Sequence, residues 1–101
     1  MLRKFRAYQM AKELYQDCKN LKLKGVTRDQ LERASLSTCL NLAEGSGKNT
    51  AKERKRFYTI SLGSLREVQA LLDLLNHQKL STKADYLGAV IWRLLQNPGS
   101  F

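Results

Sequence analysis

The sequence is poor in residues that break helices or support metal and acid–base chemistry. Its 101 residues include one proline, six glycines, two cysteines and one histidine. Cys18 and Cys39 have no metal-ligand spacing and lie in helical patterns, so we interpret them as reduced thiols in or near a core. His77 has no second histidine or paired carboxylate with which to form a catalytic set. We expect no metal, no cofactor and no enzymatic activity.

Long apolar runs are also missing. No segment approaches the roughly 18 apolar residues of a membrane-spanning helix. The first residues, MLRKFRAYQMAKEL, lack the apolar stretch of a signal peptide. We therefore expect no membrane contact and a cytoplasmic location.

Acidic residues are scarce relative to basic ones. Nine Asp and Glu stand against 18 Lys and Arg, which leaves a net charge of +9. Residues 1–60 carry 14 of the basic and six of the acidic residues, so most of the excess lies in this part. So large an excess on a small domain favours polyanionic partners, with nucleic acid first among them.

The residues that are abundant favour helices, and strand alternation is absent. Apolar residues recur at helical spacing over about 3–23, 27–44, 50–77 and 82–96. Gly25 and the Gly45–Gly47 pair suit helix ends, while Thr27, Thr50 and Ser81 or Thr82 suit helix starts. The short connections make sequential helices antiparallel. We predict one all-α domain over residues 1–101, an antiparallel up-and-down four-helix bundle.

The third helix has an apolar arc roughly 200° wide, against about 100–140° for a helix buried on one side. Tyr58, Leu62 and Leu65 widen the arc sideways. Because a four-helix bundle has no central helix, we interpret these three residues as an oligomer interface. Gly63 and Ser64 lie in mid-helix, where glycine costs about 0.5–1 kcal/mol relative to alanine. We interpret both as structural residues at a close approach of another helix.

The stretch NLAEGSGKNTAKERKR, residues 41–56, contains a Gly-Lys pair that invites comparison with a phosphate-binding loop. A Walker A loop requires glycine five positions before that pair and Ser or Thr after it, and it follows a strand. Here those positions hold Leu42 and Asn49, and no strand precedes them. The spacing and the context both exclude nucleotide hydrolysis by such a loop.

Basic residues open the third helix, where cations oppose the helix dipole. Selection for stability alone favours acidic residues at this position, so the cations indicate a bound anion such as a backbone phosphate. The first helix of an antiparallel bundle begins at the same end, which adds its own cations. The candidate nucleic-acid-binding residues are Arg3, Lys4, Arg6, Lys12, Lys48, Lys52, Arg54, Lys55 and Arg56. An ordinary solvated charged face remains the alternative interpretation.

Three segments resemble the 23S ribosomal RNA intervening-sequence proteins, a bacterial four-helix-bundle family. They are NLAEG at 41–45, RF at 56–57 and LGSLRE at 62–67, and the likeness extends through FRAYQMAKELY and LERASLSTCL. The resemblance implies a homopentamer with a basic surface or channel. A related group, the accessory variability determinants of diversity-generating retroelements, implies nucleic acid and a reverse transcriptase as partners. No catalytic residues carry over.

The chain departs from that family at Cys39, where a proline is common, so a kink in the second helix is weaker or absent here. Asn41, Glu44 and Gly45 belong to the shared motif, and we interpret them as structural. Glu44 ends a helix, where a carboxylate is disfavoured, so we expect Arg56 or the next helix's amides to hold it. The leading hypothesis is a non-enzymatic oligomer that binds RNA or DNA with little sequence preference. The alternative is a scaffold whose basic surface docks an acidic protein.

Overall fold

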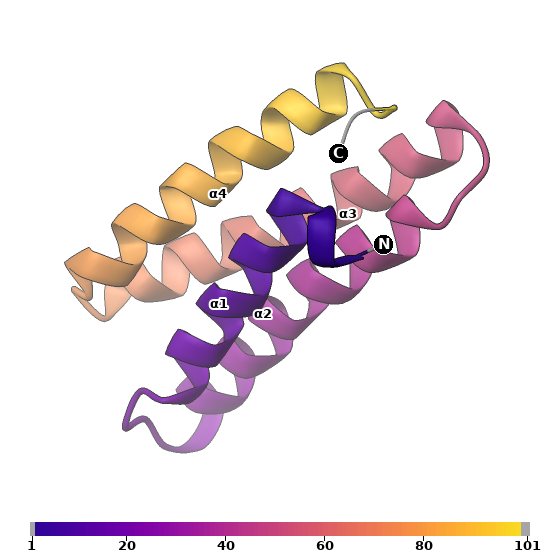
Figure 1. Ribbon diagram of the computed structural model, residues 1–101. Helices are drawn as coiled ribbons and strands as arrows, with labels where there is room; N and C mark the ends of the chain where they lie inside the picture. The colour runs from indigo at the N-terminus through magenta and orange to yellow at the C-terminus, as the bar shows by residue number, and fades with distance from the viewer. Residues whose placement is uncertain (1, 100–101) are drawn as a thin grey trace.

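Four α-helices pack as an antiparallel bundle in the computed structural model, which describes residues 2–99 (Figure 1). A 3-10 turn, η1 (Leu2–Lys4), precedes α1 (Arg6–Lys19), α2 (Gly25–Ser46), α3 (Ala51–Leu74) and α4 (Gln78–Gln96). Each helix packs on the next in the chain, and α1 also packs on α4. No strand occurs in the described range, so the all-α prediction is confirmed.

Several predicted helix ends are wrong, because local caps override the glycine and hydroxyl signals. Helix α1 ends at Lys19, and Gly25 begins α2 with a φ of 65°, which glycine adopts without strain. Helix α3 ends at Leu74, three residues early. His77, rather than Ser81 or Thr82, caps α4, because its Nδ1 accepts the Leu80 N–H at 3.3 Å. The Thr50 cap is confirmed, since its hydroxyl accepts the Glu53 N–H at 3.1 Å.

Helix α2 runs unbroken from Gly25 to Ser46 through Cys39, as expected without proline. Gly47, and not Gly45, is its C-cap. Gly45 lies inside the last turn, where it packs against α3. A Cβ atom at Gly45 would lie 2.7 Å from Cε1 of Tyr58 and 3.0 Å from Cβ of Phe57. Only glycine fits between the two helices here, so Gly45 serves packing and not the helix end that the sequence suggested.

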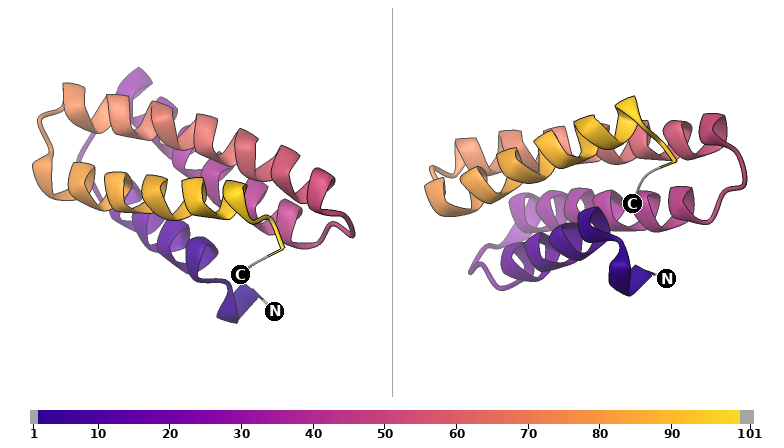
Figure 2. Two further views of the ribbon diagram at one scale, coloured as in Figure 1. Left: turned by 90° about the horizontal axis from the view of Figure 1, so that it is seen from above. Right: turned by 45° about the horizontal axis from the view of Figure 1, so that its top comes forward.

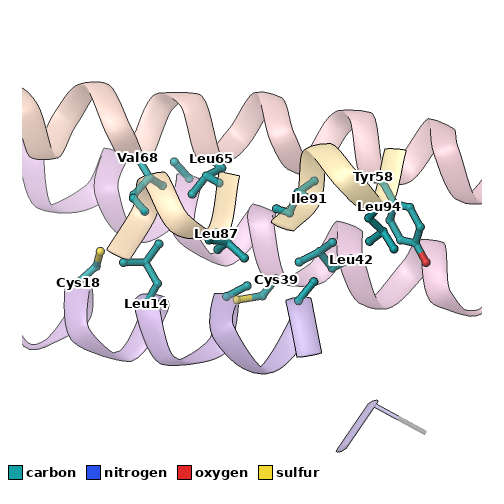
Figure 3. Packing of buried hydrophobic residues seen from close by; sticks show 14 of the residues in the cluster. Leu14, Cys18, Cys39, Leu42, Tyr58, Leu65, Val68, Leu87, Ile91 and Leu94 are labelled. Atoms are coloured by element: carbon teal, nitrogen blue, oxygen red, sulfur yellow. The ribbon is translucent and has the colours of Figure 1, made fainter. Parts of the chain in front are cut away.

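The core runs the length of the bundle and is built from all four helices (Figure 3). Tyr58 and Leu65, predicted at an oligomer interface, are fully buried within this core. That prediction is wrong for both residues, because the wide apolar arc of α3 is covered from two sides by its neighbours α2 and α4. Leu62 is half-buried at the edge of the core, so part of its side chain remains exposed to solvent.

A line of small polar side chains holds α2 against α3. Ser37 and Ser64 join their hydroxyls at 2.7 Å, and Asn41 Nδ2 donates to the Ser37 carbonyl at 2.9 Å. The buried Ser61 hydroxyl donates to the Thr38 carbonyl at 2.7 Å. Short side chains let the two backbones approach and leave few buried polar groups unpaired. Ser64 therefore joins α3 to α2, whereas the hydrogen bonds of Asn41 lie within α2.

Gly63 differs from its neighbour Ser64. It is exposed on α3, and a Cβ atom there would meet nothing within 4 Å. No helix of the same protomer approaches it, so its predicted close contact is not made within the bundle. Any packing role for Gly63 must involve another molecule.

Polar contacts tie α1 to α4, the other pair that closes the bundle (Figure 2). Lys83 Nζ forms ion pairs with Glu13 and Asp17 of α1. Hydrogen bonds to Asp17 and Glu13 raise the pKa of Lys83 above its usual value. Nearer the start of α1, Arg6 Nη2 donates to the Tyr86 hydroxyl at 2.9 Å.

Replacing Gly45 by alanine tests the tight contact between α2 and α3. We expect Gly45→Ala to lower the free energy of unfolding by about 1–3 kcal/mol, because the methyl group collides with the Tyr58 ring. Gly63→Ala is the matched control: with open space around it, alanine should add about 0.5–1 kcal/mol through helix propensity. Chemical denaturation at one protein concentration measures both. A Gly45→Ala protein as stable as the parent would contradict the contact.

The Tyr58 hydroxyl is buried without a hydrogen-bond partner in the described part of the chain. Burial raises the pKa of this phenol, with an opposing effect from Arg54. A buried hydroxyl that makes no hydrogen bond costs about 1–3 kcal/mol. We therefore expect Tyr58→Phe to leave the melting temperature unchanged or to raise it. A loss of several degrees would show that the hydroxyl is bonded in solution.

Candidate nucleic-acid interface

Four helix termini meet at one end of the bundle: the starts of α1 and α3 and the ends of α2 and α4 (Figure 1). The rings of Phe5 and Tyr58 lie 6.0 Å apart, which joins the start of α1 to α3. Arg54 Nε donates to the Pro98 carbonyl at 2.9 Å, which joins α3 to the end of α4. Sequence segments more than 40 positions apart therefore share this end.

We call this end of the bundle the basic end. Residues 2–7, 44–57 and 90–99 supply nine cations against two carboxylates, an excess of seven of the chain's nine net charges. The cations are Arg3, Lys4, Arg6, Lys48, Lys52, Arg54, Lys55, Arg56 and Arg93. Eight of them were expected from the sequence. The end is therefore the main source of positive field on the protomer.

Most cations of the basic end make no ion pair, although some cations elsewhere on the bundle do. Away from it, Arg33 pairs with Glu67 and Lys83 with Glu13 and Asp17. At the basic end, within residues 2–99, only Lys48 makes an ion pair. Lys52 and Lys55 are exposed on α3. They keep their full charge available to a ligand.

Phe57 orders two of these cations without neutralising them. Lys48 Nζ lies 5.0 Å from the centre of the Phe57 ring, and the Arg56 guanidinium lies 5.1 Å from it. Such contacts with an aromatic face stabilise an exposed cation by about 0.5–1 kcal/mol. The positive charge remains free to attract phosphate.

The Arg54 side chain has a structural role that the sequence did not reveal. Besides its bond to Pro98, its Nη1 donates to the Lys48 carbonyl at 3.0 Å, and its side chain is half-buried. One guanidinium thus joins the α2–α3 connection to the residues after α4. Any contact of Arg54 with nucleic acid would use only its remaining N–H groups.

Glu44 is held differently from the prediction. Its carboxylate pairs with Lys48 Nζ at 3.2 Å, one turn further along the chain. Neither Arg56 nor the amides at the start of α3 bond to it in the described residues. Because Lys48 reaches back over the last turn of α2, the carboxylate is compensated from within its own helix end.

The remaining predicted contacts differ in position. Arg3 and Lys4 lie exposed in η1, directly before the start of α1. Lys12 is also exposed, but it lies about 9 Å along α1 from Arg6 and so borders the basic end rather than belonging to it. Arg93, near the end of α4, was missed. The predicted antiparallel topology could have identified Arg93, since α4 must end where α1 and α3 begin.

Both cysteine side chains lie in the core of the bundle. Burial raises the pKa of Cys18 to about 12 and that of Cys39 to about 11. Both thiols are free and buried, as the sequence indicated. Within residues 2–99, no group of three or more His, Cys, Asp or Glu side chains gathers as metal ligands. No helix in that range is long and apolar enough to span a membrane.

Comparison with known proteins identifies the family to which the chain belongs. Neither the curated proteins nor the solved structures contain a match to the chain. The family model described as 23S rRNA-intervening sequence protein matches residues 3–89. The match includes α1, α2 and α3 and extends into α4, further than the sequence motifs alone reach. Since it spans most of the chain, the protein belongs to the 23S rRNA-intervening sequence protein family.

Proposed function

We propose that the protein is a non-catalytic, oligomeric nucleic-acid-binding protein whose basic end contacts the phosphate backbone of RNA or DNA. The excess of seven positive charges at that end is the observation that carries the proposal. Stability alone does not account for it, since Lys52 and Lys55 lie in the first two turns of α3 and oppose its dipole.

Binding of this kind draws its free energy from the release of counterions from the nucleic acid. Each phosphate neutralised contributes a slope of about −0.9 in a plot of log affinity against log salt for duplex DNA, and about −0.7 for single strands. The exposed lysines suit this role, because each reaches a phosphate as a mobile point charge. The resulting affinity depends on salt and little on base sequence.

Self-association is supported by exposed apolar side chains on α2 and α3. Leu36, Leu40 and Ile60 are 39%, 56% and 43% exposed. The Ser37–Ser64 and Thr38–Ser61 contacts place Ile60 level with Leu40, so these side chains form one apolar patch. We call it the α2–α3 patch. Side chains of this size remain exposed in a group mainly where another molecule covers them.

A second exposed apolar group lies on the α3–α4 side. Trp92 is 55% exposed, and the contact of Gln69 with Asp85 places it level with half-buried Leu62. Two unlike patches suit a head-to-tail contact, which closes into a ring when the rotation between subunits is right. We propose that the subunits form a ring of this kind, the homopentamer that the family resemblance implies, with Leu62 at the interface between subunits. We also propose that the protein is located in the cytoplasm.

For a protein partner we propose the reverse transcriptase of a diversity-generating retroelement. Its support is the motif resemblance to the accessory variability determinants together with the basic end, which could meet the same nucleic acid as the polymerase. Co-purification with a reverse transcriptase encoded next to this gene tests the pairing. A gene lying within a ribosomal RNA operon, with no such neighbour, would contradict it.

The basic end is tested by charge reversal of Lys52 and Lys55. These lysines are exposed and unpaired, whereas reversal of Arg54 would also break its bonds to Pro98 and Lys48. We expect Lys52→Glu/Lys55→Glu to weaken binding to RNA or DNA at least about tenfold. The slope of log affinity against log salt should fall by about one for each lysine. Fluorescence anisotropy over a salt series measures both quantities.

The matched control reverses Lys22 and Lys79, which are exposed and unpaired at the opposite end of the bundle. It changes the net charge by the same amount, so a general loss of positive charge would weaken both variants equally. We expect the control to bind nearly as the parent does. Equal losses for the two variants, or no binding by the parent at low salt, would refute the role of the basic end.

Assembly is tested on the α2–α3 patch. We expect Leu40→Glu/Ile60→Glu to dissociate the oligomer while the helical content stays unchanged, because both side chains lie outside the protomer's core. Val26→Glu is the control, since Val26 is 75% exposed at the distant start of α2. Light scattering after size exclusion gives the mass of each. A monomeric parent, or a variant whose mass equals the parent's, would contradict this interface.

A further inference from the structure

A groove of about 320 Å³ opens between the start of α1 and the end of α4, at the side of the basic end. Phe5, Val90 and Leu94 supply its apolar lining, and Arg6, Arg93 and Asn97 supply its polar groups. No carboxylate lines it. Its volume is at the low end of the roughly 300–1,000 Å³ of small-ligand sites. The groove suits a flat apolar group that carries negative charge.

An exposed aromatic ring lies next to this groove. Tyr86 is 54% exposed, and it precedes Val90 by one helical turn and Arg93 by two on the same side of α4. Arg6 fixes the ring, because it donates a hydrogen bond to the hydroxyl and its guanidinium lies 5.7 Å from the ring centre. The ring is therefore held in place by a cation while about half of its surface faces solvent.

We propose that Tyr86 and the groove bind unpaired bases, so that the protein prefers single-stranded nucleic acid to a duplex. The inference rests on the proposed function and names its substrate class. One base stacks on Tyr86, and the adjacent base enters the groove over Val90 and Leu94. Arg6 and Arg93 contact the phosphates that join them.

The groove's charge and size select this occupant over others. Two arginines in a groove whose lining holds no carboxylate disfavour a cationic ligand and favour one that carries phosphates. A partner helix, about 10–12 Å wide with its side chains, is too large for the space. A duplex presents phosphates to the same arginines, but its bases are stacked inside and cannot reach the Tyr86 ring. Only unpaired bases use all of these features.

The test compares one homopyrimidine single strand with a blunt duplex of equal length, at fixed salt. We expect Tyr86→Leu to weaken single-strand binding about 5- to 150-fold, the loss associated with one stacked base. Duplex binding should change less than about twofold, since the basic end remains intact. Tyr86→Phe keeps the ring and should retain single-strand affinity.

Each other outcome has a distinct meaning. If Tyr86→Leu binds both ligands like the parent, or weakens both equally, the single-strand inference is overturned while the proposed function stands. If the parent binds neither ligand, both fail. A change in oligomer mass in Tyr86→Leu, but not in Tyr86→Phe, would show that another subunit covers the ring, which also overturns the inference. Circular dichroism of both variants confirms that the helices are intact.

Discussion

The contact between Gly45 and the Tyr58 ring is the constraint on which the rest of this structure depends. Without a side chain at Gly45, the ring enters the space beside the last turn of α2 and becomes fully buried. From there it meets Phe5, so the same ring also fixes the start of α1. Three helix termini are thereby held together. The basic end exists because this contact brings residues 2–7 beside residues 44–57.

Holding those termini together has an electrostatic cost that the structure offsets only in part. Cations crowd the start of α3, where the helix dipole also disfavours them. Three kinds of contact each offset part of this unfavourable electrostatic free energy. They are the Thr50 cap, the Lys48–Glu44 ion pair and the contacts of Lys48 and Arg56 with the Phe57 ring. None of them neutralises Lys52, Lys55 or the cations of η1. A bound polyanion would relieve the remaining repulsion, which is why the proposed ligand and the fold are consistent.

How far the sequence could predict the structure depended on the range of the interactions. Helical periodicity is local, and it located all four helices. The predicted caps were wrong where a loop conformation or another local cap decided the boundary, as at Gly25 and His77. The apolar arc of α3 was assigned to an oligomer interface wrongly at Tyr58 and Leu65, since covering by both α2 and α4 is a property of the assembled bundle. Arg54 and the Arg6–Tyr86 pair involve partners 44 and 80 positions away, which no local pattern reveals.

The distribution of paired and unpaired charges bears on whether assembly and binding can coexist. On the lateral face of α2 and α3, Arg33 is paired with Glu67, and the exposed side chains beside it are apolar. Subunits that meet through this face would bring little net charge into contact. The cations of the basic end lie away from this face, at the end of the bundle, where a ring would leave them open on one surface. Each added subunit would contribute its own excess of seven charges to that surface. Because counterion release grows with the number of phosphates contacted, the ring would bind a long strand far more tightly than one protomer could.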